Sequence, residues 1–170
     1  MNRRTTMAAL TGAVLAAALA ASPAAYARSG AVAQKCEAID SKGVKALFAE
    51  WNEALKDITA KKVVALYASD ATLLPTVENG PYTKQDGGIQ NYFLHFVELR
   101  PVATIDEAKR FIKTGCNVAY DIGLYSFQVD ADHATVRDTI RARYTFIYRW
   151  DGKRWLIAHH HSSKQPVEAP

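Results

Sequence analysis

The hydrophobic residues of this chain change their spacing part-way along it, and this change limits the possible folds. Before residue 100, apolar side chains recur at steps of three and four residues, which is typical of amphipathic helices. After residue 100, the chain is rich in Ile, Val, Tyr, Phe and Thr, as strands are. Helices followed by a run of long strands predict an α+β domain, in which N-terminal helices pack on a strongly curved, mostly antiparallel sheet.

The helical part is expected to hold two long helices and a short one. The first helix follows Asp40, has Ser41 as its expected N-cap, and presents a stripe of Val44, Leu47, Phe48, Trp51, Leu55 and Ile58. A shorter helix is expected at residues 63–67, and a buried strand at residues 71–76. The last helix covers about residues 84–99, and its inner side consists of Ile89, Tyr92, Phe93, Phe96 and Val97.

Four segments that resemble strands follow, at residues 103–113, 117–129, 135–149 and 154–163. Turn-forming residues at 130–133 and 151–153 predict hairpin connections. A bent sheet that is closed by helices forms a cone with a cavity at its open end. We expect a functional site in that cavity.

The N-terminus has the three parts of a secretory signal peptide. Arg3 and Arg4 give it a positive start, an apolar run follows, and residues 25–27 have the small-x-small pattern that signal peptidase cleaves. The apolar run, at about 15 residues, is too short to span a bilayer. We therefore expect a periplasmic or secreted protein that is not attached to a membrane after cleavage. The expected organisation is a signal peptide at 1–27, a linker at 28–36, one domain at 37–166 and a tail at 167–170.

The charge of the chain argues against nucleic acid as a partner. The chain has 21 Lys and Arg residues against 17 Asp and Glu, which gives a net charge of +4. Removal of Arg3 and Arg4 with the signal peptide leaves 19 against 17, and the remaining basic residues are not clustered. Binding to nucleic acid needs a basic patch or stripe, so we expect none.

The chain has two cysteines, Cys36 and Cys116. An exported chain reaches an oxidising compartment, which permits a disulfide between them. Two separate buried thiols are the alternative, and the sequence leaves both open.

The last expected strand carries an unusual polar run, His159-His160-His161-Ser162-Ser163. Because side chains alternate along a strand, one face would hold Trp155, Ile157, His159, His161 and Ser163. The other face would hold Leu156, Ala158, His160 and Ser162. At least one of these polar sets must be buried, and buried polar groups need hydrogen-bond partners. The run therefore predicts a hydrogen-bonded site.

Several segments of the chain resemble one protein family. They are Leu73-Leu74-Pro75-Thr76, Tyr92-Phe93, Arg143-Tyr144-Thr145-Phe146, Asp151-Gly152-Lys153 and the polar run itself. They resemble the calcium/calmodulin-dependent kinase II association domain and its bacterial relatives, and exported members that end in His-His-His-Ser-Ser resemble the iota class of carbonic anhydrases. The likeness extends from about Cys36 to Pro166. The family motif continues with Met-Pro, whereas this chain has Gln165-Pro166.

The resemblance implies a fold and an activity. The fold is the nuclear transport factor 2-like cone, which SnoaL-like cyclases and ketosteroid isomerases share. The activity is the reversible hydration of carbon dioxide to bicarbonate, and we favour a form that needs no metal. Carried over by motif, His160 activates water, and Ser162, Thr76 and Tyr92 hold the substrate by hydrogen bonds. The other implied pocket residues are Tyr125, Arg143, Thr145, His161 and Ser163. An imidazole pKa near 6.5 would suit proton exchange close to neutral pH.

A metal-bound hydroxide is the other route to hydration. His159 and His161 share one face of the strand and could both bind zinc, and manganese is a second candidate metal. A third ligand would have to be His95, His133 or Asp121.

Two other functions stay open. A non-catalytic module would bind a small carboxylate or assemble the chain into dimers or rings, as the kinase association domain does. A SnoaL-like isomerase or cyclase would need an Asp or Glu base in an apolar pocket. The candidates for that base are Asp70, Asp121 and Glu78.

Assembly is expected from the fold. A curved sheet has one face covered by helices and leaves the other face open for pairing. We expect Tyr144, Phe146 and Tyr148 to form that open face and the chain to form a homodimer or a higher homo-oligomer.

Overall fold

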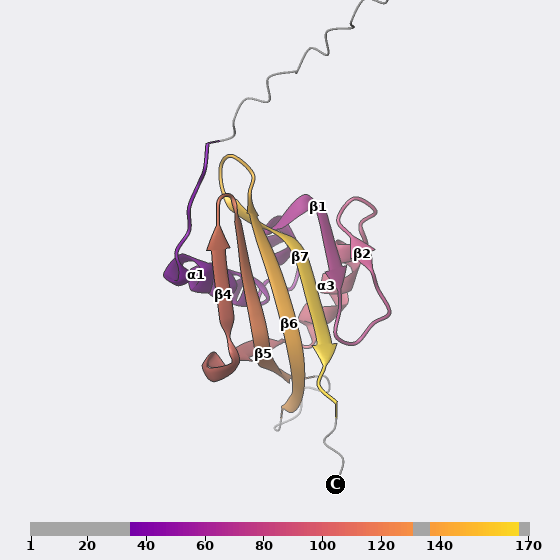
Figure 1. The fold of residues 1–170 in the computed structure, drawn as a ribbon. Coiled ribbons are helices and arrows are strands. Elements are labelled where there is room, and N and C mark those ends of the chain that lie inside the picture. Colours follow the sequence, from indigo (N-terminus) through magenta and orange to yellow (C-terminus); the bar gives the residue numbers. More distant parts are fainter. Residues whose placement is uncertain (1–34, 131–136, 167–170) are drawn as a thin grey trace, which may run out of the picture. The chain divides into compact units, whose positions relative to one another are not determined.

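The structure, a computed structural model, describes residues 35–130 and 137–166. The expected signal peptide, the tail, most of the linker and most of the turn at 130–133 lie outside the described residues. No helix in these two ranges is long and apolar enough to cross a membrane. The elements in order are α1 (Ser41–Ala54), α2 (Lys61–Ala65), β1 (Tyr67–Leu74), β2 (Tyr82–Thr83), α3 (Gly88–Glu98), β3 (Val102–Ile105), η1 (Glu107–Lys109), β4 (Phe111–Gly115), β5 (Val118–Val129), β6 (Asp138–Trp150) and β7 (Trp155–Lys164) (Figure 1).

Helix α1 begins and ends slightly earlier than the sequence pattern predicts. Its N-cap is Asp40 and not Ser41, because the Asp40 carboxylate accepts a hydrogen bond of 2.7 Å from the Gly43 N–H. The helix ends at Ala54, so Ile58 lies beyond it and is 75% exposed. The rest of the predicted stripe faces the core, with Leu47 partly buried and Val44, Phe48, Trp51 and Leu55 buried.

The boundary between α2 and β1 also differs from the prediction. Tyr67, expected in the short helix, is the first residue of β1, because it pairs with Ile157 of β7. Strand β1 ends at Leu74, before Pro75. Pairing with a distant strand, which the local pattern does not contain, sets this boundary.

Helix α3 and the strands after it show two more differences. Helix α3 begins at Gly88 rather than near residue 84, since residues 82–83 pair with β1 as strand β2. The segment 103–113, predicted as one strand, is interrupted at Asp106, whose carboxylate accepts a hydrogen bond from the Ala108 N–H at the start of η1. The five residues predicted for the inner side of α3 are all buried, as expected.

One sheet contains all seven strands. Its order is β2-β1-β7-β6-β5-β3, and β4 also pairs with β5, beside β3. The pairing of β1 with β7 is parallel, and the other pairings are antiparallel. The predicted α+β class with a mostly antiparallel sheet is therefore confirmed.

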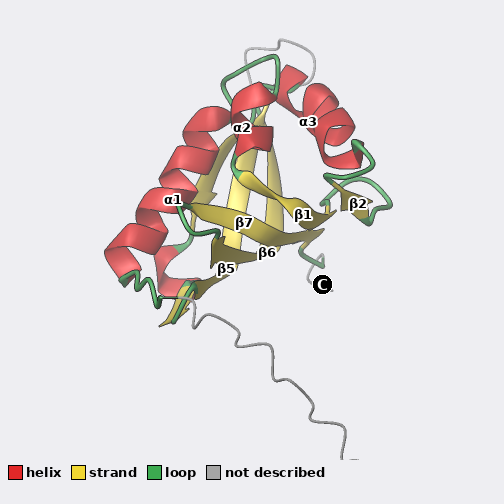
Figure 2. Ribbon diagram, turned by 90° about the horizontal axis from the view of Figure 1, so that it is seen from above, coloured by secondary structure: helices red, strands yellow, loops and turns green. Residues whose placement is uncertain are grey.

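Helices α1, α2 and α3 lie over the same face of the curved sheet (Figure 2). The core fills the space between them, and Tyr144, Phe146 and Tyr148 of β6 are buried in it. The prediction that these three aromatic residues form an open face for pairing is therefore wrong. The outer face instead displays the residues between them, such as Thr145.

An extra residue in β7 determines which side chains point inward. Tyr148 pairs with Ile157 and Ile147 pairs with His159, so Ala158 has no partner of its own and forms a bulge. Ile157 therefore lies on the inner face together with His160, whereas strict alternation places the two on opposite faces. Beyond the bulge the alternation resumes.

A buried ion pair fixes the start of β4 against β5. The Arg110 guanidinium donates to both carboxylate oxygens of Asp121, at 3.0 and 2.6 Å, and the Tyr144 hydroxyl donates to the same carboxylate at 2.9 Å. These donors compensate a carboxylate that is fully buried. The segment before β4 approaches β5 closely at Gly123, where a Cβ atom would lie 2.5 Å from the Lys109 carbonyl oxygen.

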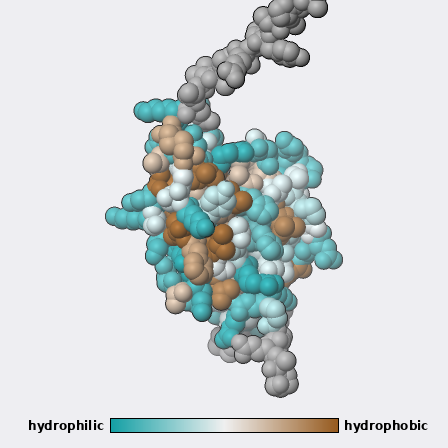
Figure 3. Space-filling view, viewed as in Figure 1, coloured by the Kyte–Doolittle hydropathy of each residue, from teal (hydrophilic) through white to brown (hydrophobic). Residues whose placement is uncertain are grey.

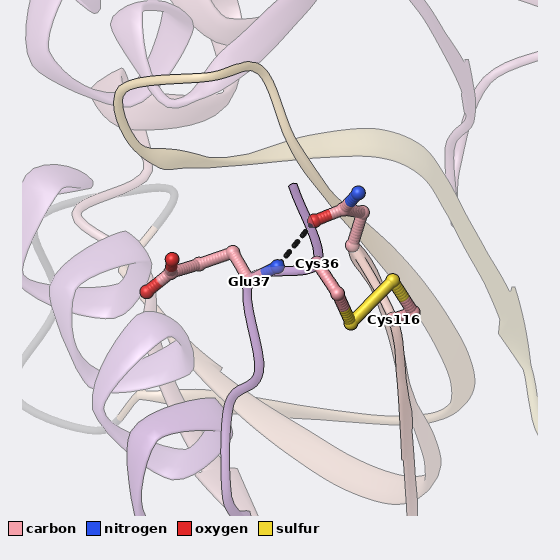
Figure 4. Close-up of a disulfide and its surroundings, with 4 residues drawn as sticks. Cys36, Glu37 and Cys116 are labelled. Carbon is pink, nitrogen blue, oxygen red and sulfur yellow. Dashed lines mark hydrogen bonds between the residues drawn. A yellow bond between two sulfur atoms is a disulfide. The ribbon is translucent and has the colours of Figure 1, made fainter. Parts of the chain in front are cut away.

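Cys36 and Cys116 form a disulfide, which settles the alternative left open by the sequence (Figure 4). Their Cα atoms are 5.1 Å apart. Next to the disulfide, the Glu37 N–H donates to the Asn117 side chain at 2.7 Å, and the Asn117 N–H donates to the Glu37 carbonyl at 3.0 Å. The segment before α1 is thereby fastened to the turn between β4 and β5.

Gly123→Ala is expected to lower the free energy of unfolding by about 1–3 kcal/mol, because the new methyl group overlaps the Lys109 carbonyl next to Arg110. Chemical denaturation measures the change. Gly115→Ala is the matched control, since the nearest atom to a Cβ atom there lies 3.4 Å away, and we expect a change within about 0.5 kcal/mol. Equal losses in the two variants would contradict this account of Gly123.

Replacing both Cys36 and Cys116 by Ser is expected to lower the free energy of unfolding by about 2–5 kcal/mol, because the bridge restricts the unfolded chain. The measurement is denaturant unfolding with and without a reductant. The reductant should destabilise the wild-type protein and leave the double variant unchanged. If the wild type and the variant were equally stable in oxidising buffer, the bridge would have no stabilising role.

Candidate functional site

Two polar residues of β7, His160 and Ser162, lie inside the domain. They are 3% and 4% exposed, respectively. They point inward because the bulge at Ala158 sets the alternation, and they pair with Phe146 and Tyr144 of β6. Their hydrogen-bond partners come from β1, β5 and the loop after β1.

The imidazole of His160 has a partner at each ring nitrogen. The Tyr67 hydroxyl lies 2.8 Å from Nδ1, and the Trp51 indole N–H donates to the same hydroxyl at 3.1 Å. On the other side, the Tyr125 hydroxyl lies 3.5 Å from Nε2. Both edges of the ring are therefore occupied by protein groups.

Ser162 continues this arrangement toward the surface. The Tyr125 hydroxyl donates to Ser162 Oγ at 2.5 Å, and the hydroxyls of Ser162 and Thr76 form a hydrogen bond with each other. Thr76 is only partly buried. We name this hydrogen-bonded series the polar row, and it consists of Tyr67, His160, Tyr125, Ser162 and Thr76.

Aromatic rings surround the buried end of the polar row. The Phe146 ring stacks on the His160 imidazole with centroids 4.0 Å apart, and the Trp51 ring meets it edge-on at 5.3 Å. Burial, together with the smaller effects of the neighbouring His159 and His161, lowers the pKa of His160 to about 3. The ring is therefore neutral near pH 7, contrary to the expectation of a pKa near 6.5.

The two tyrosines of the polar row keep their protons. Burial raises the pKa of the Tyr67 hydroxyl well above its usual value, and it also raises the pKa of Tyr125. Both hydroxyls can therefore act as hydrogen-bond donors at neutral pH. The whole row is uncharged in that state.

Tyr92 brings a further hydroxyl from α3. Its ring is buried against Phe93 and Phe96. Burial raises the pKa of this hydroxyl, and the nearby Tyr125 hydroxyl raises it further. The Tyr92 ring also lies near the ring of Tyr82, with centroids 6.2 Å apart. The structure thus places five sequence-predicted residues in one region. His160, Ser162, Thr76 and Tyr125 are joined by the polar row, and Tyr92 lies near Tyr125.

Four other predicted pocket residues lie on the opposite face of the sheet. Thr145 pairs with His161 and Arg143 pairs with Ser163, and these outward-pointing pairs alternate with the inward pair of Tyr144 and Ser162. They line an outer groove of about 650 Å³, next to Phe111 and Ile122. Figure 3 shows hydrophobic residues gathered on this face among hydrophilic ones. The grouping of Arg143, Thr145, His161 and Ser163 with His160 therefore does not hold.

The suggested metal ligands are not brought together either. His159 lies toward the outer face, and its Nδ1 is 2.7 Å from the Thr72 hydroxyl. Asp121 belongs to the buried ion pair, and His95 is exposed on α3. His133 lies outside the described residues. In the described part of the chain, no three or more His, Cys, Asp or Glu side chains are placed to hold a metal ion.

Trp51 and Tyr67 are the site residues that the sequence analysis missed. Trp51 was expected in the apolar stripe of the first helix, and Tyr67 was expected only as the end of the short helix that follows. Tyr67 is 93 residues from His160 in the chain, so no local pattern connects them. The parallel pairing of β1 with β7 brings the two residues together.

One protein family matches most of the chain, and solved structures share its fold. The calcium/calmodulin dependent protein kinase II association domain family matches residues 40–166. Among solved structures, a protein of this association-domain type from Xanthomonas campestris is 38% identical, with a TM-score of 0.69 over 75% of this chain and 89% of that one. No curated protein matches the chain.

Two more distant structures show the fold alone. An NTF2-like family protein from Streptomyces avermitilis is 9% identical, with a TM-score of 0.62 over 74% of this chain and 96% of that one. A cystatin-like protein from Nostoc punctiforme is 14% identical, with a TM-score of 0.59 over 76% of this chain and 96% of that one. The expected NTF2-like fold is therefore confirmed.

The low pKa of His160 predicts a pH dependence of stability. An unfolded His160 takes up a proton below about pH 6.5, whereas the folded one stays neutral down to about pH 3. Between these values the unfolded state binds more protons, so acidification destabilises the fold by about 1.4 kcal/mol per pH unit from this ring. The measurement compares denaturation at several pH values for the wild type and His160→Phe. An unchanged slope in the variant would show that His160 titrates normally in the folded protein.

Proposed function

Because the chain belongs to the calcium/calmodulin dependent protein kinase II association domain family, we propose that this member uses its polar row as the site of a carbonic anhydrase that works without a metal. The proposal rests on one observation. A row of hydrogen-bonded hydroxyls lies against aromatic rings and ends at the partly exposed Thr76. A hydration site for carbon dioxide must accept an apolar gas and release an oxyanion. Aromatic rings suit the first molecule, and hydroxyl donors suit the second.

In the proposed reaction, a water oxygen forms a bond to the carbon of carbon dioxide. One C–O π bond opens at the same time, and its electron pair moves to an oxygen atom. The hydroxyls of Thr76 and Tyr92 would donate hydrogen bonds to that oxygen as its negative charge develops, and Ser162 would hold the Thr76 hydroxyl in place. The proton that the water loses passes to buffer at the exposed end of the row, which leaves bicarbonate and a proton as products.

His160 would serve this reaction as a neutral group. A conjugate acid with a pKa of about 3 cannot hold the water proton near pH 7. The family resemblance predicts water activation by His160, but its low pKa argues against a role in which the ring keeps that proton. We assign His160 instead to holding Tyr125, and through it Ser162, in position.

A non-catalytic module that binds a small carboxylate is the second candidate. The observation that favours it is the lack of a basic group in the polar row, since Tyr67, Tyr125 and His160 are all neutral at pH 7. Such a row can bind an oxyanion without activating water. The isomerase or cyclase has no comparable support, because Arg110 and Tyr144 already bind the buried carboxylate of Asp121.

The disulfide, the family and the outer face bear on the localisation and the oligomeric state that we propose. The disulfide between Cys36 and Cys116 supports export to the periplasm or the medium, where disulfides persist. Family membership supports a homo-oligomer. The outer face, with Phe111 at 65% and Ile122 at 39% exposure, is apolar enough to take part in such contacts.

Stopped-flow measurement of carbon dioxide hydration tests the proposal. We expect activity that a chelator does not reduce. Ser162→Ala should lower kcat by about tenfold or more, because it removes the hydrogen bond that holds the Thr76 donor in place. Ser163→Ala is the matched control, because this neighbouring serine lies toward the outer face, and it should keep the wild-type rate.

Three outcomes of these measurements would contradict the proposal. Loss of activity on chelation would overturn the metal-free proposal. Absence of turnover, together with acetate or bicarbonate binding that Ser162→Ala weakens, would support the second candidate. Equal effects of Ser162→Ala and Ser163→Ala would exclude the polar row as the site.

A further inference from the structure

The direction of the hydrogen bonds in the polar row can be derived from its deepest member. The indole N–H of Trp51 can only donate, and it donates to the Tyr67 hydroxyl oxygen. The hydrogen of that hydroxyl needs an acceptor, because Tyr67 is fully buried. The acceptor within reach is Nδ1 of His160, 2.8 Å away.

The hydrogen bond from the Tyr67 hydroxyl fixes the tautomer of His160. A neutral imidazole carries one N–H, and a ring that accepts at Nδ1 carries it on Nε2. The Nε2–H then faces the Tyr125 oxygen at 3.5 Å. If Nδ1 carried the hydrogen instead, the Tyr67 hydroxyl would accept twice, and its own hydrogen would be buried without a partner.

The hydrogen bonds keep the same direction from Tyr125 to the surface. Tyr125 donates its hydrogen to Ser162, so the buried Ser162 hydroxyl must direct its own hydrogen to Thr76, its other partner. Thr76 accepts that bond, which leaves the Thr76 hydrogen unused at the partly exposed end of the row.

We infer that the polar row is a one-way series of donors, directed from Trp51 to Thr76, which makes its exposed end a donor site for small oxyanions such as bicarbonate or acetate. In this arrangement Tyr67 is a positioning residue that sets the tautomer of His160. The inference deepens the proposed function by naming the ligand class. It rests on the proposed function only in taking this row as the binding site, and it holds whether or not the bound oxyanion is turned over.

Nuclear magnetic resonance of protein with ¹⁵N-labelled histidine tests the direction without ligand or turnover. Two-bond ¹H–¹⁵N correlations report which ring nitrogen carries the hydrogen. We expect His160 to be protonated at Nε2 near pH 7 in the wild-type protein. A wild-type His160 that is protonated at Nδ1 would overturn the inference, even if the protein hydrates carbon dioxide.

Titrations with sodium acetate and with methylammonium chloride test the ligand class. Acetate should shift the Thr76 and Ser162 resonances in a saturable manner, and methylammonium should not. Saturable binding of methylammonium, or no binding of acetate and bicarbonate, would overturn the donor site, while the tautomer measurement would still stand on its own.

Tyr67→Phe tests the positioning role. Without the Tyr67 hydroxyl, His160 should populate both tautomers, and the Kd of acetate should rise about three- to tenfold, as for one lost hydrogen bond. Tyr148→Phe is the matched control, because the Tyr148 hydroxyl is buried and has no hydrogen-bond partner. It should leave the tautomer and the Kd unchanged. A Tyr67→Phe protein that folds and keeps a single Nε2–H tautomer would refute the positioning role.

Discussion

The indole of Trp51 connects the core of this protein to its candidate site. Its ring contacts Phe93 of α3, Phe127 of β5 and Phe146 of β6, and it also meets the His160 ring of β7. Its N–H holds the Tyr67 hydroxyl that in turn holds His160. A shift of α1 over the sheet would therefore disturb ring packing and hydrogen bonding together. The same side chain therefore both orients the polar row and fills the centre of the core.

Most of the fold could be predicted from hydrophobic spacing alone. The stripe of α1 and the inner side of α3 follow a helical period, and the long strands β5, β6 and β7 are evident from their composition. The predicted boundaries of helices and strands were wrong where pairing with distant strands overrides local preference, as at Tyr67 and at residues 82–83. They also failed at Asp106, where one side-chain hydrogen bond starts a turn inside an otherwise strand-like segment.

The site could be predicted only in part. Motif resemblance identified His160, Ser162 and Thr76, which are indeed joined by hydrogen bonds. It also grouped Thr145 and His161 with them, although these lie on the other face. Strict alternation along the strand placed Ile157 on the face opposite His160, whereas the two share the inner face. The cause is the bulge at Ala158, which depends on how β6 and β7 align and is not evident from the sequence. The low pKa of His160 was not predictable either, since its cause is burial by residues from several separate elements.

The bulge at Ala158 also constrains how the length of this strand can change. The five-residue polar run serves two surfaces, with His160 and Ser162 inside and His159, His161 and Ser163 toward the outside. Point substitutions can alter either surface separately. A change of one residue in length would exchange the two sets, because every following side chain would turn to the opposite face. The chain is therefore free to vary the chemistry of its exterior here, provided that the spacing between Ile157 and His160 is kept.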